Sequence, residues 1–300
     1  NLHIASGPYD RIEALRYGAV KPEGITPNYE IRIPVHSIFV DMAEREAFDV
    51  SEMSLALYLT KRSRALAGRE AFPFVAIPVF PSRVFRHGNF FINRKTGIER
   101  PKDLEGKRVG IQEYRQTAGV WVRGILQHEF GVDLDSVKWI EGGVNEPRVP
   151  DDDMDLRPTR DLSLEIIPGD RTLNDMLEAG EIDAYYGARR PNALDSGQNV
   201  VRLFPDYREL EKDYYRKTGF HPIMHTVVIR EDIHREHPWV AASLYKAFSE
   251  AKDLAINGLY DSDALALSLP FLLDHVEEAW RTFGSDFWSY GVESNRSTLE

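Results

Sequence analysis

Two short segments of this chain gather cationic and titratable side chains in a way that suits anion binding and proton transfer. The segment PSRVFRHG carries Arg83, Arg86 and His87 between two apolar runs, each with the length of a buried strand. The segment HPIMH carries His221 and His225 before another apolar run. Arginine presents a rigid fork of donors that matches a carboxylate, and histidine exchanges protons near neutral pH. These residue types predict a site for an acidic ligand.

Each segment also has a simpler interpretation. Charges in a loop usually face solvent, and Arg86 or His221 could instead fix nearby backbone carbonyls. The functional interpretation is favoured because a similar cluster occurs twice, each time beside a predicted strand. We therefore expect at least two of the five side chains to touch a ligand.

Further candidates lie where predicted strands end. Thr117 begins a helix after the strand RVGIQ, where free N–H donors and the positive end of the helix dipole suit a carboxylate, although an ordinary N-cap is equally compatible. Glu113 and Tyr114, on the same turn, could reach a phenol hydroxyl. Arg189 follows the strand IDAYYGA and could clamp a carboxylate with two hydrogen bonds. Ser54 ends another strand and is a further expected ligand contact.

Three weaker candidates lie beside these. Glu52 shares the strand of Ser54, and we expect it to pair with a nearby arginine rather than with a ligand. Tyr9 and Asp10 follow the first predicted strand, where Asp10 could simply cap the next helix.

A metal or cofactor is not expected. No HxH or His-carboxylate spacing occurs within one predicted element, and HPIMH alone is weak support for a metal site. Asp151, Asp152 and Asp153 lie in a segment rich in Pro and Asp, 144–161, which we interpret as an exposed, solvated loop. The spacing of a calcium loop is absent around them.

The composition limits the kinds of partner that this protein is expected to bind. A net charge of -11, with no basic stripe, argues against nucleic acid, and an acidic ligand then needs a locally positive site. The chain has no cysteine, which excludes disulfides and thiolate metal sites. No apolar run approaches the roughly 20 residues that span a bilayer, so no membrane partner is expected.

The elements that must position these residues alternate between strand and helix. The first set of predicted strands covers 2–5, 29–35, 48–55 and 74–80, and the second covers 108–112, 137–140, 162–167, 182–186, 200–204 and 226–229. Helices between strands predict parallel, helix-covered sheets. Residues 238 to about 283 are predicted to be helical. The pattern indicates a two-lobed α/β protein, with 1–82 plus 222–300 in one lobe, 83–221 in the other, and a central cleft.

Longer motifs identify a family. DLEGKRVGIQ and GEIDAYYGAR resemble the type 2 periplasmic-binding-protein fold, although both pieces occur in many binding proteins. FPFVAIPVFPSRVFRHGNFFIN, TAGVWVRGIL and LFPDYRELEKDYYRKTGFHPIMHTVVIRED are similar to the 4,5-dihydroxyphthalate decarboxylase family. Blocks of this resemblance cover most of residues 8–295, and PVFPSRVFRHG and GFHPIMHT carry most of its specificity.

The resemblance implies a cytoplasmic carboxy-lyase that acts on a small hydroxylated aromatic dicarboxylate. Several decarboxylase classes use a metal, but the residue spacing described above favours a mechanism without a cofactor. A homo-oligomer is possible. The expected reaction converts 4,5-dihydroxyphthalate to 3,4-dihydroxybenzoate. His225 or His87 would be the proton donor, and Arg83, Arg86 and Arg189 would hold the carboxylates. The alternative is a non-catalytic solute-binding protein that delivers an aromatic carboxylate to a transporter, because fold alone does not decide function.

Overall fold

The computed structural model divides the chain into two units, each built around one mixed β-sheet. Unit 1 comprises Asn1–Arg83 and Thr218–Glu300, and unit 2 comprises Val84–Lys217. The structure describes residues 1–148, 162–196 and 198–300. Most of the predicted 144–161 loop, including its three aspartates, therefore lies outside the described residues.

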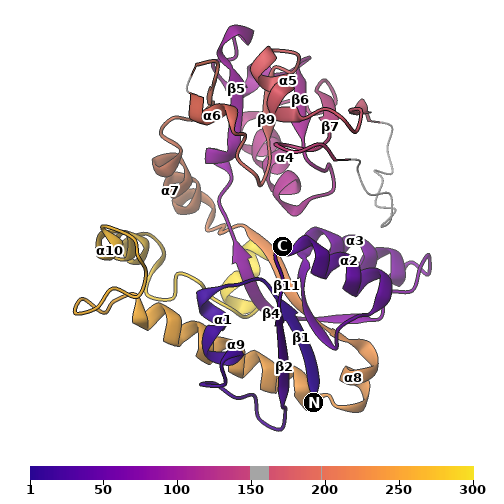
Figure 1. Ribbon diagram of the computed structural model, residues 1–300, viewed down its shortest axis with the longest axis vertical. Coiled ribbons are helices and arrows are strands. Elements are labelled where there is room, and N and C mark those ends of the chain that lie inside the picture. Colours follow the sequence, from indigo (N-terminus) through magenta and orange to yellow (C-terminus); the bar gives the residue numbers. More distant parts are fainter. Residues whose placement is uncertain (149–161, 197) are drawn as a thin grey trace. The chain divides into compact units, whose positions relative to one another are not determined.

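Unit 1 has a five-stranded sheet in the order β2-β1-β3-β11-β4 (Figure 1). Its strands are β1 (Leu2–Ser6), β2 (Pro27–Ile31), β3 (Val50–Ser54), β4 (Phe74–Arg83) and β11 (Ile223–Arg230). Its helices are α1 (Asp10–Arg16), α2 (His36–Arg45), α3 (Leu55–Leu66), α8 (Glu231–Glu236), α9 (Trp239–Gly258), α10 (Leu272–Phe283) and α11 (Arg296–Leu299).

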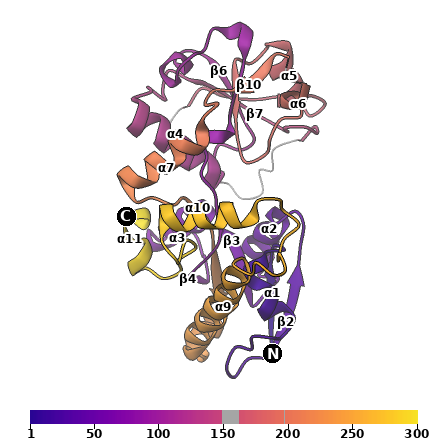
Figure 2. The same ribbon diagram turned by 90° about the vertical axis from the view of Figure 1, so that its left-hand side faces the viewer.

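Helices cover both faces of this sheet. Helices α1 and α9 pack against each other on one face, while α2 and α3 lie on the other, as Figures 1 and 2 show together. The apolar stripe of α9, which includes Leu244, Ala247, Phe248 and Ala251, is buried in the same core cluster as strand residues such as Val227. This burial, roughly 25 cal/mol per Å² of apolar surface, holds α9 on the sheet.

Unit 2 has a six-stranded sheet in the order β10-β5-β9-β6-β7-β8. Its strands are β5 (Phe90–Asn93), β6 (Arg108–Ile111), β7 (Lys138–Glu141), β8 (Leu164–Ile166), β9 (Ala184–Tyr186) and β10 (Val200–Arg202). Its helices are α4 (Thr117–Phe130), α5 (Leu173–Ala179), α6 (Ala193–Ser196) and α7 (Tyr207–Thr218). Two separate apolar clusters form its core, one with α4 and one with α5.

The sheets differ from the predicted parallel arrangement. Strand β11 runs antiparallel to β3 and β4, and β5 runs antiparallel to β9 and β10. Both strands follow the points where the chain passes from one unit to the other, so each enters its sheet from the other unit and not through a βαβ crossover within that sheet.

Several predicted boundaries were also wrong. β11 begins at Ile223, which places His225 inside the strand, and β4 continues through Pro81 to Arg83. β2 ends at Ile31, Ile33 is 79% exposed, and α2 starts at His36. The predicted helix over 238–283 is interrupted between α9 and α10.

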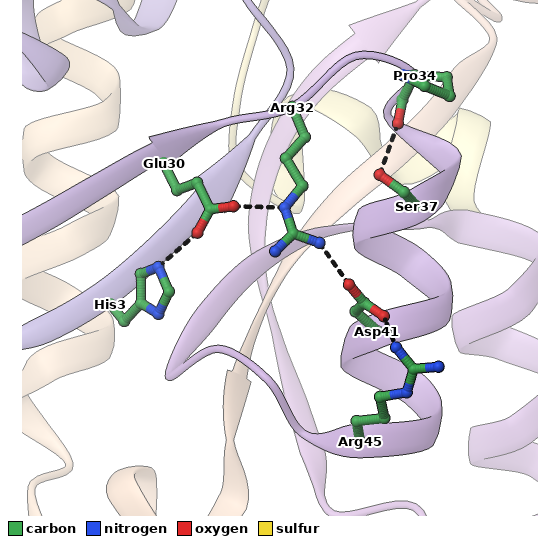
Figure 3. Close-up of polar contacts among 7 residues, drawn as sticks. All are labelled: His3, Glu30, Arg32, Pro34, Ser37, Asp41 and Arg45. Carbon is green, nitrogen blue, oxygen red and sulfur yellow. Dashed lines mark hydrogen bonds and ion pairs between the residues drawn. The ribbon is translucent and has the colours of Figure 1, made fainter.

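A chain of ion pairs joins β1, β2 and α2 (Figure 3). His3 Nε2 lies 2.8 Å from Glu30 Oε2, and the same carboxylate accepts from Arg32. Arg32 also contacts Asp41, to which Arg45 Nη1 donates at 2.7 Å. His3 and Glu30 are each about one third exposed, so each pair contributes little stability on its own.

None of the helices in the described ranges is long and apolar enough to cross a membrane.

Candidate active site

Three strand ends of unit 1 bring polar side chains to one edge of its sheet. β1 and β3 are parallel, so the residues that follow β1 lie beside the end of β3. β11 is antiparallel and starts at this edge, where His225 is paired with Ser54 of β3 and with Ser82 of β4. The carboxyl edge of such a sheet is where ligands of α/β proteins bind.

Glu52 is the centre of this edge and is fully buried on β3. Its Oε1 accepts from His225 Nδ1 at 2.5 Å and from the Tyr9 hydroxyl at 2.6 Å. Its Oε2 accepts from the backbone N–H of Gly7 at 2.8 Å. Burial pushes the pKa of Glu52 upward, but the charge of His225 and the three hydrogen bonds outweigh it and hold the pKa below its usual value.

The turn after β1 is shaped to reach this carboxylate. A Cβ on Gly7 would lie 2.6 Å from Val35 Cγ1 and 2.9 Å from Tyr9 Cζ, so only glycine allows the backbone to approach so closely. Burial and the Glu52 carboxylate raise the pKa of Tyr9, which keeps its phenol protonated and donating.

His225 is held on two sides and partly exposed. Its ring meets Phe39 edge to face at 4.9 Å between centroids, and its Nδ1 is bound to Glu52. The side chain is 17% exposed. Within the described residues, Nδ1 is the ring nitrogen with a hydrogen-bond partner, so Nε2 is the nitrogen available to a ligand. This geometry suits a histidine that transfers a proton.

Arg83 and His221 lie next to this edge, at the end of β4 and just before β11. The buried Arg83 guanidinium donates to the carbonyl oxygen of His221 at 2.9 Å, to that of Ser289 at 2.6 Å, and to the Asn295 side chain. The His221 ring stacks on Phe283, and burial lowers the pKa of His221 to about 3. These contacts fit the structural alternative given above for His221, and they give Arg83 a structural role of the same kind.

Arg86 and His87 belong to unit 2, where both are buried. The His87 ring lies 5.1 Å from that of Tyr214, and burial lowers the pKa of His87 to about 4. Burial also lowers the pKa of Arg86 to about 10. His87 is therefore neutral at pH 7 and enclosed by aromatic rings, and of the two predicted proton donors the geometry favours His225.

Glu211 on α7 lies beside these two residues. Its carboxyl accepts from the Gly88 N–H at 3.1 Å, and burial raises its pKa to about 7. His87 Nδ1 lies 3.9 Å away. Between about pH 4 and pH 7, His87 is neutral because its pKa is lowered, and Glu211 is protonated because its pKa is raised. The two groups are therefore not an ion pair at mildly acidic pH.

The start of α4 brings together three predicted site residues. Thr117 is the first residue of the helix and is buried, while the N-cap position belongs to Gln116, so the expected N-cap assignment is shifted by one residue. Glu113 is ion-paired to Arg148 and lies 3.5 Å from Arg115 Nε. Glu113 is thus already neutralised by arginine.

Tyr114 is fixed by packing at the same turn. Its backbone N–H donates to Glu141 at 2.9 Å, and the Arg123 guanidinium lies 3.7 Å from the centre of its ring. Arg123 Nη1 also donates to the buried Tyr186 hydroxyl at 3.2 Å. These contacts hold the ring of Tyr114 in one orientation.

Arg189 follows β9 and is exposed. Its carbonyl oxygen accepts from the Tyr185 hydroxyl at 2.9 Å, which fixes the backbone. Across the described ranges its guanidinium has no ion pair, whereas that of Arg190 is paired with Asp195. Arg189 thus has the free donors that a carboxylate clamp needs.

The sequence interpretation missed the importance of Glu52 and Tyr9. The available signal was a charged residue inside the strand segment FDVSEMSL, where Val50 and Met53 are buried on either side. A buried carboxylate needs partners, but the partner is His225, 173 positions away, and not the arginine that we expected. In the part of the chain that the structure describes, no group of three or more His, Cys, Asp or Glu is arranged to hold a metal.

Comparison with known proteins gives two kinds of relatives. A family described as NMT1/THI5 like matches residues 81–156. The chain is 37% identical to a 4,5-dihydroxyphthalate decarboxylase from Comamonas testosteroni, across 100% of this chain and 89% of that protein. It is 36% identical to one from Pseudomonas putida, across 73% of this chain and 83% of that protein.

Among solved structures, several neighbours are periplasmic binding proteins. A sulfonate-binding protein from Methylobacillus flagellatus aligns with a TM-score of 0.51 at 12% identity, over 99% of this chain and 84% of its own. An aliphatic sulphonate binding protein from Escherichia coli aligns with a TM-score of 0.50 at 11% identity, over 92% of this chain and 82% of its own. These matches confirm the predicted periplasmic-binding-protein-like fold and carry no functional assignment.

Proposed function

This chain belongs to the 4,5-dihydroxyphthalate decarboxylase family, and from that premise we propose that it converts 4,5-dihydroxyphthalate to 3,4-dihydroxybenzoate and carbon dioxide. The family predicted from the sequence motifs is confirmed, and the reaction class is that of a carboxy-lyase. The observation that carries the assignment to a site is the pair of the buried Glu52 and the partly exposed His225 at the carboxyl edge of the unit 1 sheet.

The chemistry requires a proton donor beside the ring. A hydroxyl para to the departing carboxylate pushes electrons into the ring, so the carbon that bears the carboxylate can accept a proton. The bond to the carboxylate then breaks, its electron pair returns to the ring, and carbon dioxide leaves. His225 supplies the proton and regains one from water. A positioned acid of this kind typically contributes about 10²–10⁴-fold to the rate.

The second carboxylate of the substrate needs fixed cations or N–H donors. We propose Arg189 as the principal clamp, because it is exposed and has no ion pair among the described residues. Thr117, at the N-terminus of α4, stays a proposed carboxylate contact, and Ser54 and Tyr114 stay proposed contacts for the remaining substrate oxygens. For Arg83 and His221, the observed contacts support structural roles more than substrate binding, while Arg86 is buried and stays a proposed substrate contact.

The decisive experiment mixes the purified protein with 4,5-dihydroxyphthalate and follows carbon dioxide release. Turnover in the wild type that is lost in His225→Ala is the expected result. His128→Ala, which changes an exposed histidine on α4, is the matched control and should leave turnover unchanged. Tight binding without turnover would overturn the proposal and indicate the solute-binding alternative.

The proposed mechanism uses no metal. Exhaustive chelation should therefore leave turnover unchanged, because proton transfer by His225 and carboxylate binding by Arg189 need no Lewis acid. A loss of activity that one divalent ion restores would contradict this mechanism.

We also propose that the protein works in the cytoplasm, as the family resemblance implies. The distribution of its activity between cytoplasmic and periplasmic fractions of the host cell tests this location. Recovery in the periplasmic fraction would contradict it.

We propose self-association through one apolar segment of unit 1. Residues 261–271 are all exposed, although the segment contains Leu265, Leu267, Leu269 and Phe271. Phe271 is 75% exposed. Most soluble oligomers are symmetric, so a second copy would meet this segment with its own equivalent and cover both. Several large apolar side chains are thus exposed within eleven residues, and a large exposed apolar patch typically marks an interaction site.

A further inference from the structure

We propose that Glu52 is a positioning residue that fixes the tautomer and the orientation of His225, so that Nε2 is the nitrogen that exchanges the proton with the substrate. This inference rests on the proposed function, which assigns proton transfer to His225. It adds that the acid is a three-residue unit, Tyr9–Glu52–His225, in which one buried carboxylate aims the imidazole.

The tautomer follows from the chemistry of the contact. Glu52 has its pKa held below the usual value, so its oxygens are acceptors only. His225 Nδ1, 2.5 Å from Oε1, must then carry a hydrogen in both the neutral and the charged imidazole. The neutral ring therefore has its lone pair on Nε2, and the imidazolium carries its second, transferable proton there.

Glu52 can aim the ring because its own position is fixed from the opposite side. The Gly7 N–H holds Oε2 at 2.8 Å, and the Tyr9 hydroxyl shares Oε1 with His225 at 2.6 Å. Tyr9 in turn accepts a hydrogen bond from Ser82. With Phe39 against the imidazole, neither the carboxylate nor the ring is free to rotate.

During the reaction, the proton moves without a change at Nδ1. The imidazolium transfers its Nε2 proton to the ring carbon, the bond to the carboxylate breaks, and carbon dioxide leaves with no net electron transfer. His225 is left neutral with Nδ1–H still donating to Glu52, and water restores the Nε2 proton. The carboxylate stays ionised throughout, so it acts through His225 and not on the substrate.

Unit 1 contains a second histidine–carboxylate pair, which serves as a control. His3 and Glu30 also make a histidine–carboxylate contact between strands, at 2.8 Å (Figure 3). That contact uses Nε2 instead of Nδ1, its members are each about one third exposed, and its carboxylate is shared with Arg32. A substitution in this pair changes the same chemical group on the same sheet without touching the Tyr9–Glu52–His225 unit.

The test substitutes Glu52→Gln, with Glu30→Gln as the control, in the full-length protein. The expected result for Glu52→Gln is a fall in kcat of about 10- to 100-fold or more, with KM changed less than about 3-fold, because loss of an orienting partner typically has a cost of this size. Glu30→Gln should leave both constants unchanged. A Glu52→Gln enzyme with the wild-type kcat would overturn the proposal.

A second readout needs no turnover. In ¹⁵N-histidine-labelled protein, the signals of His225 are identified by their loss in His225→Ala. The wild type should show neutral His225 as the Nδ1–H tautomer, and Glu52→Gln should shift it toward Nε2–H or a mixture. An Nε2–H tautomer in the wild type would overturn the proposal. An inactive wild type with the expected tautomers would count against the proposed function and support the positioning role of Glu52.

Tyr9→Phe tests the Tyr9–Glu52–His225 group even if the Glu52→Gln variant does not fold. It removes one donor from the carboxylate and leaves the His225 contact in place. A retained Nδ1–H tautomer with kcat reduced about 3- to 10-fold, less than in Glu52→Gln, is expected. A complete loss of the tautomer in Tyr9→Phe would show that Tyr9, and not Glu52, holds the imidazole.

Discussion

Arg189 and Arg190 are neighbours in the sequence and differ in what their guanidinium groups contact. Arg190 is paired with Asp195, whereas Arg189 has no ion pair in the described ranges. Both are exposed, so substitution of either should leave the core of unit 2 intact. Substituting each arginine in turn separates the loss of a guanidinium that is available to the substrate from a general loss of positive charge.

Arg189→Ala should weaken substrate binding by about 10- to 100-fold, since a hydrogen bond to a charged group contributes about 1.5–3 kcal/mol. The measurement is the dissociation constant of the substrate in the inactive His225→Ala background. Arg190→Ala is the control and should change it less than about 3-fold. Equal effects of the two substitutions would exclude a specific clamp.

Glu211 predicts a pH dependence of stability. Burial raises its pKa to about 7, so the folded state binds a proton that the unfolded state, with a pKa near 4.5, releases earlier. The stabilisation is fully present below pH 4.5 and is lost as the pH rises through 7. With about 1.4 kcal/mol per pKa unit, the loss is up to about 3 kcal/mol.

Glu211→Gln removes this dependence and keeps an acceptor for the Gly88 N–H. The difference in unfolding free energy, variant minus wild type, should become more positive between pH 5 and pH 8. Urea denaturation at both pH values measures it. A difference that is constant with pH would show that Glu211 titrates normally.

Histidine chemistry could be predicted from the sequence, but the partner of the histidine could not. HPIMH drew attention to His225 because of its residue types, and the structure places this residue at the carboxyl edge of the sheet. The contact with Glu52 depends on the pairing of β11 with β3, and no local pattern encodes a pairing between strands so far apart. His87 packs beside Tyr214, which is also distant in the sequence, so the segment PSRVFRHG alone does not predict that His87 is buried.

At the scale of elements, one side chain at the end of β4 makes hydrogen bonds to the C-terminal residues 289 and 295. Arg83, the last residue of β4, donates to groups of three residues, His221, Ser289 and Asn295. The predicted strand over 74–80 was too short, because β4 continues to Arg83. A ten-residue strand thereby carries this guanidinium into the interior of unit 1.

Arg83→Ala should lower the free energy of unfolding by about 2–4 kcal/mol, because buried carbonyl groups lose a charged donor. Chemical denaturation measures this loss. Arg45→Ala, which removes a largely exposed arginine from α2, should cost less than about 0.5 kcal/mol. If Arg83→Ala kept its stability and lost substrate affinity, Arg83 would instead be the carboxylate clamp first predicted.

The alternation of strands and helices was sufficient to predict the type of fold, but strand direction was not. Helix α4 begins at Thr117, as predicted, and it ends before Gly131, whose left-handed backbone caps it. The direction of β11 depends on where the returning chain re-enters unit 1. That is a property of the whole fold, which is why a fully parallel sheet was wrongly expected.

For the whole molecule, the exposed apolar segment 261–271 predicts an assembly. Leu267→Asp combined with Phe271→Asp should shift the mass measured by light scattering toward that of a monomer, because a charge in an apolar interface is costly to bury. Asp263→Ala, in the same segment, is the control and should leave the mass unchanged. A wild type that is monomeric at every concentration would contradict the proposed self-association.

The position of β11 also constrains the order in which a newly made chain can fold. β11 lies between β3 and β4, yet the ribosome makes it only after all of unit 2. Until residue 230 has emerged, the first 83 residues lack the strand that joins β4 to the rest of their sheet, and Glu52 lacks His225. Unit 2 is complete in sequence at Lys217 and can fold first. Unit 1, whose first 83 residues are synthesised before unit 2, therefore completes its sheet only after unit 2 has been synthesised.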